Sequence, residues 1–223
     1  MPKKTLRPDL KQLLNALMNE VLLGNTHLSI ANGLREADPV VLDTAGVFFG
    51  LTLTAHLEAA QMYAAKLFDT HRGAETIDTL LAAAGRNTHL FANGTPQEVR
   101  AAARSAKHRV RGLDPVMKAV RVRRNKMLAH LDPETVCDPV KLLRDTKLTL
   151  DDLSKVFGVS GEIVNEISRL YMNATHLMRF PRHDDYKHAL KLVADAKCAE
   201  IRKYEDEYKT QWTGARPKDC PTV

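Results

Sequence analysis

Residues 121–132 read RVRRNKMLAHLD, a dense run of cationic side chains that leads into a histidine and an aspartate. Pro133 follows and predicts the end of a helix, because proline has no N–H to donate and restricts the residue before it. Arginine binds phosphate in a planar fork and keeps its charge, and histidine, with an unperturbed pKa of about 6.5, can transfer protons near neutral pH. Together these groups suit the cleavage of a phosphodiester. A solvated basic helix face that ends in a histidine favoured by the helix dipole would have the same composition.

The composition favours helices and an anionic partner. The chain has 223 residues, of which 44% are hydrophobic and 5% aromatic, and its formal net charge is +6. This length suits one large domain or a domain with an appendage. Alanine, leucine, lysine, arginine and glutamate recur throughout and are strong helix formers, whereas the scarcity of aromatic residues disfavours a β-rich fold. The positive charge suits a nucleic acid without requiring one.

The cysteines and the apolar runs predict a soluble, cytoplasmic protein. The chain has three cysteines that lie far apart, with no C-x-x-C pair, and they are expected to be free thiols in a reducing compartment. The N-terminus has two lysines but no apolar signal core. The most apolar run, residues 45–55, is roughly half of the ~20 residues that a membrane helix needs.

Helical periodicity and turn signals divide the chain into antiparallel helices without a credible pair of strands. The sequence predicts helices over residues 8–36 (one helix, or two joined near Gly24), 40–68, 75–84, 96–110, 115–130, 149–178 and 184–212. The second of these is apolar on nearly all sides and is expected to be the central, most enclosed helix. The T-x-x-E at residues 95–98 and the T-x-x-D at residues 149–152 predict capping boxes. The expected fold class is all-α, an antiparallel helical bundle over residues 1–181, with an additional charged C-terminal helix and frayed tail over residues 182–223.

The order of these features resembles the HEPN superfamily, a group of helical-bundle domains that includes many metal-independent ribonucleases. Arg124 and Asn125, followed five residues later by His130, match its arginine-polar-x(4–6)-histidine signature. The longer string, which continues through Lys126 to Asp132, is similar to the Arg-Asp-Lys-x-x-Ala-His-x-Asp of the abortive-infection U-type (AbiU-like) branch. Asparagine at position 125 replaces the aspartate that is commoner in that branch.

Three further stretches resemble the same branch. Residues 65–69, Ala-Lys-Leu-Phe-Asp, are similar to the end of its second helix, which closes on a basic residue, an apolar pair and an aspartate. Residues 76–81, Thr-Ile-x-x-Leu-Leu, are similar to the Ser-Leu-x-x-Leu-Leu that starts its next helix, and residues 149–170 to its last bundle helix. The likeness covers roughly residues 8–180, so the charged helix after Asp184 lies outside it.

The resemblance implies a metal-independent endoribonuclease without a cofactor, active as a homodimer in which the two motifs meet in one cleft. His130 would transfer a proton at the ribose 2′-OH or the leaving oxygen, Arg124 would hold the scissile phosphate, and Asn125 would orient the cleft. The product would end in a 2′,3′-cyclic phosphate. The biological role would be that of a toxin or of phage defence, with an antitoxin protein as a further partner. Expected RNA contacts are Arg121, Arg123 and Lys126, and second-tier site residues are Asp132 and Asp69.

Helix geometry leaves the identity of the catalytic arginine open. Arg124 and His130 are six residues apart, which is about 240° of rotation, so they do not share a face of a regular α-helix. Arg123, seven residues before His130, does share its face. Either the helix distorts before Pro133, or the site combines residues from both protomers. The family match favours Arg124, and geometry alone favours Arg123.

Two other classes of protein fit parts of the sequence. A non-catalytic dimeric HEPN-like module would use the same basic helix to bind RNA or a nucleotide, or to act as an antitoxin, without cutting. Residues 150–170 have the apolar and glycine spacing of a helix-turn-helix DNA reader, with Gly158 in the turn. Glu162 and Glu166 on its recognition helix would oppose binding to DNA phosphates, and a continuous helix through Gly158 would exclude this motif.

A metal site is a weaker interpretation of the segment after residue 181. Histidines and aspartates gather at His183, Asp184, Asp185 and His188. The two histidines do not share a helix face, and the start of a charged helix explains all four residues more simply. No metal ligand is therefore expected.

Overall fold

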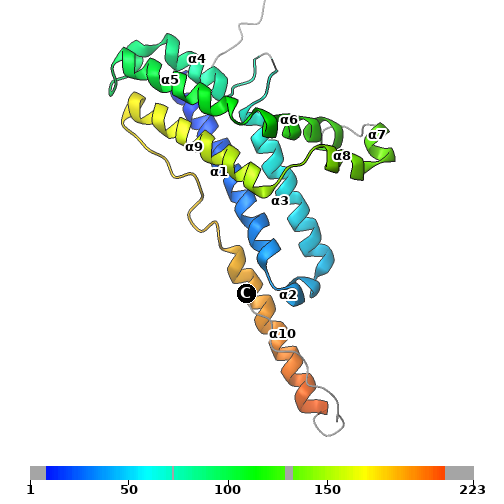
Figure 1. Cartoon of the computed structure of the whole chain (residues 1–223). Coiled ribbons are helices and arrows are strands. Elements are labelled where there is room, and N and C mark those ends of the chain that lie inside the picture. The colour runs from blue at the N-terminus through cyan, green and yellow to red at the C-terminus, as the bar shows by residue number, and fades with distance from the viewer. Residues whose placement is uncertain (1–8, 72, 129–132, 209–223) are drawn as a thin grey trace, which may run out of the picture. The chain divides into compact units, whose positions relative to one another are not determined.

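The computed structural model describes residues 9–71, 73–128 and 133–208 (Figure 1). Within these ranges the chain forms helices joined by turns and loops, with no strand, which confirms the all-α helical-bundle class. The elements are α1 (Leu10–Glu36), α2 (Pro39–Asp43), α3 (Gly46–Leu67), α4 (Ile77–Arg86), η1 (Thr88–Leu90), α5 (Pro96–Arg111), α6 (Asp114–Arg123), η2 (Arg124–Leu128), α7 (Pro133–Cys137), α8 (Pro139–Asp145), α9 (Leu150–Met172) and α10 (Tyr186–Tyr208).

The chain is organised in two compact units. The first combines Met1–Leu28 with Glu58–Phe180, and the second combines Ser29–Leu57 with Pro181–Val223. The long helices α1 and α3 each contribute residues to both units. The two units are groups of residues in mutual contact, so they do not test the domain boundary expected near residue 181. That boundary stays a prediction.

The first unit has a continuous apolar core. Its apolar positions on α1 recur every three or four residues, which places them on one stripe of the helix. Full burial of such a side chain stabilises the fold by about 1.5–3 kcal/mol. The largest side chains that are completely enclosed here are Leu14, Leu17, Leu67, Ile77, Leu80, Leu81, Leu113, Phe157, Ile163 and Ile167.

Helix α1 runs without a break through Gly24, so the first of the two alternatives left open by the sequence holds. The reason lies on α9, because the ring of the fully buried Phe157 occupies the space beside Gly24. A Cβ atom at Gly24 would lie 2.2 Å from Cε1 of Phe157. The glycine therefore serves close helix packing rather than a turn.

Two glycine substitutions test this packing. Gly24→Ala is expected to lower the free energy of unfolding by about 1–3 kcal/mol, because the enclosed Phe157 ring must shift. Gly158→Ala is the matched control: it lies inside α9 with nothing within 4 Å of its Cβ position, and should raise stability by about 0.5–1 kcal/mol. Denaturant titrations measure both. Equal effects of the two substitutions would contradict this account.

Capping boxes begin three of the helices. At α5, the Thr95 N–H donates to Glu98 at 2.7 Å and the Thr95 side chain accepts from the Glu98 N–H. At α9, the Thr149 N–H donates to Asp152 at 2.9 Å, with the reciprocal bond also present. Both boxes were predicted from the sequence and are confirmed. Thr76 and Thr79 form a third box at α4.

Helix α9 corrects two sequence expectations. It is continuous through Gly158, which excludes the helix-turn-helix interpretation of residues 150–170. It ends at Met172 rather than near residue 178, because Asn173 adopts a left-handed conformation with φ of 53° and caps the helix. The following segment folds back on α9: the backbone N–H of His176 donates to Asn165 at 2.7 Å, and its ring nitrogen lies 2.8 Å from the Ser168 hydroxyl.

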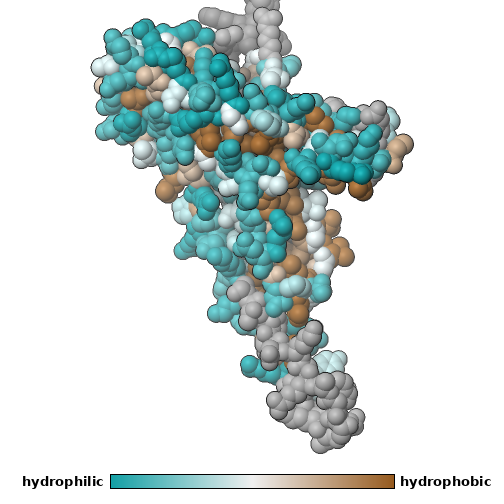
Figure 2. Space-filling view, viewed as in Figure 1, coloured by the Kyte–Doolittle hydropathy of each residue, from teal (hydrophilic) through white to brown (hydrophobic). Residues whose placement is uncertain are grey.

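The expectation that the second long helix is the most enclosed one was wrong. The short helix α2 and the long helix α3 replace the predicted single helix over residues 40–68. The N-terminal half of α3 is largely exposed. Val47 is 81% and Leu51 67% exposed, and Figure 2 shows hydrophobic residues gathered along this helix. Only its C-terminal part, with Ala60, Ala64, Ala65 and Leu67, is buried. Apolar residues on all sides of a helix predict burial only where the chain supplies a neighbour for each side.

The second unit has its own small core, formed by Leu34, Val41, Leu190 and Ala194. Phe49 and Leu53 of α3 pack on this cluster, and Tyr186 covers Gly33. Helix α10 begins at Tyr186, close to the predicted start at residue 184, and its predicted end at residue 212 lies outside the described residues. In the part of the chain that the structure describes, no helix is long and apolar enough to cross a membrane.

Candidate functional site

The cationic motif lies where α6 changes into a π-helix. Residues Arg124–Leu128 form η2, whose hydrogen bonds span five residues instead of four. Such turns are rare and occur frequently at functional sites. The helix therefore does distort before Pro133, and the 240° separation expected for a regular α-helix no longer applies. The C-terminal end of the motif, with His130 and Asp132, lies outside the described residues.

Arg124 connects the motif to the end of α3. Its Nη1 lies 3.0 Å from Oδ2 of Asp69, and its Nε donates to Oδ1 of Asn125 at 3.0 Å. The two charged side chains are about one-quarter exposed, 24% for Arg124 and 27% for Asp69. The structure therefore brings together three of the residues proposed from the sequence, although Asp69 and Arg124 are far apart in the chain.

The Asp69 carboxylate is held in its ionised form. Its Oδ1 accepts a 2.9 Å hydrogen bond from the backbone N–H of His71. This bond lowers the pKa of Asp69 below its ordinary value of 3.8, and the charge of Arg124 lowers it further, against the opposing effect of burial. Asp69 is consequently an anion at neutral pH and a permanent partner for the guanidinium group.

One edge of Arg124 is left for a ligand. A guanidinium group has five N–H donors on three nitrogens. Asn125 engages Nε and Asp69 engages Nη1, while no residue in the described ranges bonds to Nη2. An anion that approaches this edge can take both N–H groups of Nη2, or a fork of Nη1 and Nη2.

Arg123 is directed to a different element. Its Nε donates to Oγ1 of Thr146 at 3.1 Å, and its Nη2 donates to the carbonyl oxygen of Leu143 at 3.4 Å. Burial lowers the pKa of the Arg123 guanidinium, although arginine keeps its charge at neutral pH. The two neighbouring arginines thus contact different elements: Arg124 bonds to Asp69 at the end of α3, and Arg123 bonds to the end of α8.

The remaining motif cations lie on the same segment. Arg121 of α6 and Lys126 of η2 are both half-buried. Sequence reasoning missed Thr146, because a threonine after a short helix has no distinguishing pattern. The structure also has two short helices, α7 and α8, in the stretch between the predicted helices over residues 115–130 and 149–178.

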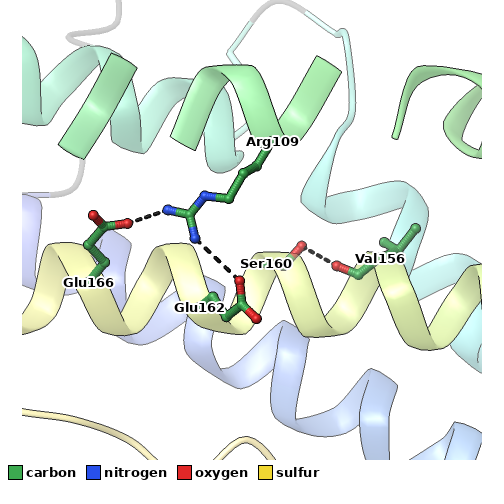
Figure 3. Close-up of polar contacts among 5 residues, drawn as sticks. All are labelled: Arg109, Val156, Ser160, Glu162 and Glu166. Atoms are coloured by element: carbon green, nitrogen blue, oxygen red, sulfur yellow. Dashed lines mark hydrogen bonds and ion pairs between the residues drawn. The ribbon is translucent and has the colours of Figure 1, made fainter. Parts of the chain in front are cut away.

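A second polar cluster joins α5 to α9. Arg109 pairs through Nη1 with Glu162 at 3.3 Å and through Nη2 with Glu166 (Figure 3). An open pocket of about 590 Å³ lies here, lined by Ser105, Arg109, Glu162, Asn165, Glu166, Arg169 and Thr175. Its two arginines and two glutamates balance in charge, so it offers no preference for an anion. The cluster is best explained as a link between the two helices.

The described residues after Pro181 also lack a metal-binding arrangement. No group of three or more His, Cys, Asp or Glu side chains within the described ranges could hold a metal ion. His183, Asp184, Asp185 and His188 form no such group in the structure. Asp184 instead lies 3.9 Å from Lys187, as expected at the start of a charged helix.

An all-α bundle whose helical motif carries an arginine, a polar neighbour and a downstream histidine defines a HEPN-type domain. The chain belongs to the AbiU2 family of these domains, because the AbiU2 family model matches residues 7–193. The match extends past the limit near residue 180 expected from the motifs and includes the start of α10. No curated protein and no solved structure shows a significant match to the chain.

Proposed function

We propose that the protein is a metal-independent endoribonuclease of the HEPN type that acts as a toxin or in phage defence. The observation that carries this proposal is the arrangement of Arg124. Its guanidinium is held on two nitrogens by Asp69 and Asn125, and its Nη2 edge is available for an anion. Membership of the AbiU2 family supports a role in abortive infection.

In the proposed reaction, the ribose 2′-oxygen attacks the adjacent phosphorus while His130 removes the 2′-OH proton or protonates the leaving 5′-oxygen. Water makes the other of these two proton transfers. The bond between phosphorus and the 5′-oxygen breaks, so the products are a 2′,3′-cyclic phosphate and a 5′-hydroxyl. Arg124 holds the scissile phosphate and stabilises the charge that grows on its oxygens. Asn125 and Asp69 orient Arg124, and Arg121 and Lys126 add contacts to neighbouring phosphates.

We further propose that two copies of the chain form the active species. The segment that follows the motif carries exposed apolar side chains, among them Val136 and Val140 of α7 and α8. Exposed apolar patches of this kind mark interaction surfaces, and their position beside the motif favours a dimer in which the two motifs approach each other. An antitoxin protein is proposed as a further partner that would control the activity in the cell.

The purified protein should cut single-stranded RNA in the presence of a chelator. The expected products carry 2′,3′-cyclic phosphate ends, which mass spectrometry distinguishes from linear phosphates. RNA that is bound but left intact would overturn the nuclease proposal in favour of a non-catalytic RNA-binding module. Cleavage that requires added divalent metal would overturn the proposed mechanism.

The ionisation of Asp69 gives a separate prediction. Because its folded-state pKa lies below the ordinary value of 3.8, its contribution to stability is complete above that value and is lost as the pH falls through the lower folded pKa. A carboxyl NMR titration of Asp69 should therefore have its midpoint below 3.8. Any change of activity between about pH 5 and 8 would then belong to another group, with histidine the natural candidate. A midpoint above 3.8 would contradict the proposed ion pair between Asp69 and Arg124.

A further inference from the structure

One hydroxyl group links the end of α8 to the last residue of α6. Thr146 is only 8% exposed, and its Oγ1 accepts the 3.1 Å hydrogen bond from Nε of Arg123. The same hydroxyl donates to the carbonyl oxygen of Leu142 at 2.6 Å. The proton of the hydroxyl therefore points at Leu142, which leaves a lone pair directed at the guanidinium.

The second bond of Arg123 reinforces this link. Its Nη2 donates to the carbonyl oxygen of Leu143, one of the unpaired carbonyls at the C-terminal end of α8. Arg123 thus caps α8 with two bonds, and it does so as a half-buried side chain. We call this set of contacts among Arg123, Thr146 and Leu143 the α8 clasp.

The α8 clasp begins where the π-helix begins. Arg123 is the last residue of α6 and Arg124 the first of η2, and the two are anchored to different elements. Successive side chains on a helix point about 100° apart, so two such anchors fix the rotation of the turn that carries them. Asp69 defines one direction, and Thr146 defines the other.

We propose that Thr146 is a positioning residue for Arg124, because its hydroxyl holds the π-helical turn through Arg123. This inference rests on the proposed nuclease function for its catalytic consequence, but the structural link stands on the contacts alone. It also gives Arg123 a structural role in place of the phosphate-binding or catalytic role considered from the sequence. Without the clasp, the Nη2 edge of Arg124 would sample other directions, and the phosphate would be held less often in the reactive geometry.

Two substitutions of the full chain test the hydroxyl. Thr146→Val keeps the shape of the side chain but removes the acceptor for Arg123, whereas Thr146→Ser keeps the hydroxyl. We expect Thr146→Val to lower kcat for RNA cleavage by about 10- to 100-fold with little change in KM, and Thr146→Ser to restore most of the rate. Amide hydrogen exchange over residues 124–128 should be roughly tenfold faster in the valine variant than in the serine variant.

A matched control separates this effect from the loss of a local helix bond. Thr54 donates to the carbonyl oxygen of Gly50 at 2.9 Å, the same four-residue bond that Thr146 makes to Leu142, but no arginine among the described residues bonds to it. Thr54→Val should leave both kcat and the exchange of residues 124–128 unchanged.

The outcomes separate the clasp from the nuclease function. If wild-type protein does not cleave RNA, the proposed function fails, and the exchange comparison alone still decides the clasp. Unchanged exchange over residues 124–128 in the valine variant would overturn the clasp. So would a serine variant as impaired as the valine variant, because the methyl group rather than the hydroxyl would then matter.

Discussion

His130→Ala is expected to lower RNA cleavage by about 10²–10⁴-fold, the range that general acid–base catalysis supplies. The physical reason is that alanine cannot exchange a proton with the 2′-OH or the leaving oxygen. RNA affinity should remain close to that of the wild type, because phosphate contacts come from the arginines and Lys126 and dominate binding. The substitution should therefore lower kcat and leave RNA affinity unchanged. The rate is measured with a labelled RNA under saturating conditions.

His89→Ala is the control for this substitution. His89 is an exposed histidine of η1 in the first unit, and its removal also changes the protein by one imidazole. It should leave both kcat and RNA affinity unchanged. A folded His130→Ala variant that cleaves RNA at the wild-type rate would end the assignment of the proton-transfer role.

The parts of the fold that the sequence predicted correctly depend on neighbouring residues. The capping boxes of Thr95 with Glu98 and Thr149 with Asp152 arise from side chains three positions apart, and these patterns are visible without tertiary knowledge. The sequence was less informative where contacts with elements distant in the chain determine the structure. The sequence left open whether α1 would break at Gly24, because the close packing of Phe157 on this glycine is visible only in the fold. The exposure of α3 was predicted wrongly, because it depends on which helices the rest of the chain supplies.

At the candidate site, too, the sequence predicted local patterns but not contacts between distant elements. Arg124 and Asn125 were identified because they form a short local motif, and Asp69 because the end of its helix resembles that of a family. The partnership between Asp69 and Arg124 required the fold. Neither the π-helix nor Thr146 has a sequence signal, because a fifth-residue hydrogen bond and a buried hydroxyl both result from the surrounding packing.

Arg124→Ala is expected to reduce kcat by about 10²–10³-fold, the cost of removing one donor to a developing oxyanion. Arg124→Lys should recover only part of the rate, because a lysine has one nitrogen and cannot bond to Asp69, Asn125 and a phosphate in the same planar arrangement. Asp69→Asn should cause a smaller loss than Arg124→Ala. The amide oxygen can still accept from His71, so Arg124 loses its bond to position 69, but its guanidinium remains to hold the phosphate.

Arg109→Ala is the charge-matched control for this series. It removes one guanidinium from the first unit at the link between α5 and α9, where Arg109 pairs with Glu162 and Glu166. It should lower stability without changing kcat for the folded fraction. Circular dichroism measures the stability, and active-site titration gives the concentration of competent sites from which kcat is calculated. An Arg124→Ala variant with wild-type kcat would show that the phosphate is held by another residue.

Mixing the Arg124→Ala and His130→Ala proteins then decides whether the site is shared between protomers. If one site takes Arg124 from one protomer and His130 from its partner, each heterodimer has one site with both residues intact and one site with neither. After subunit exchange, half of the dimers are heterodimers, so activity should return to about a quarter of the wild-type level. If both residues act within one protomer, every site in the mixture lacks one of them and activity should stay at the level of the single variants. Recovery would therefore establish the composite dimeric site, and its absence would place Arg124 and His130 of the same chain around one phosphate.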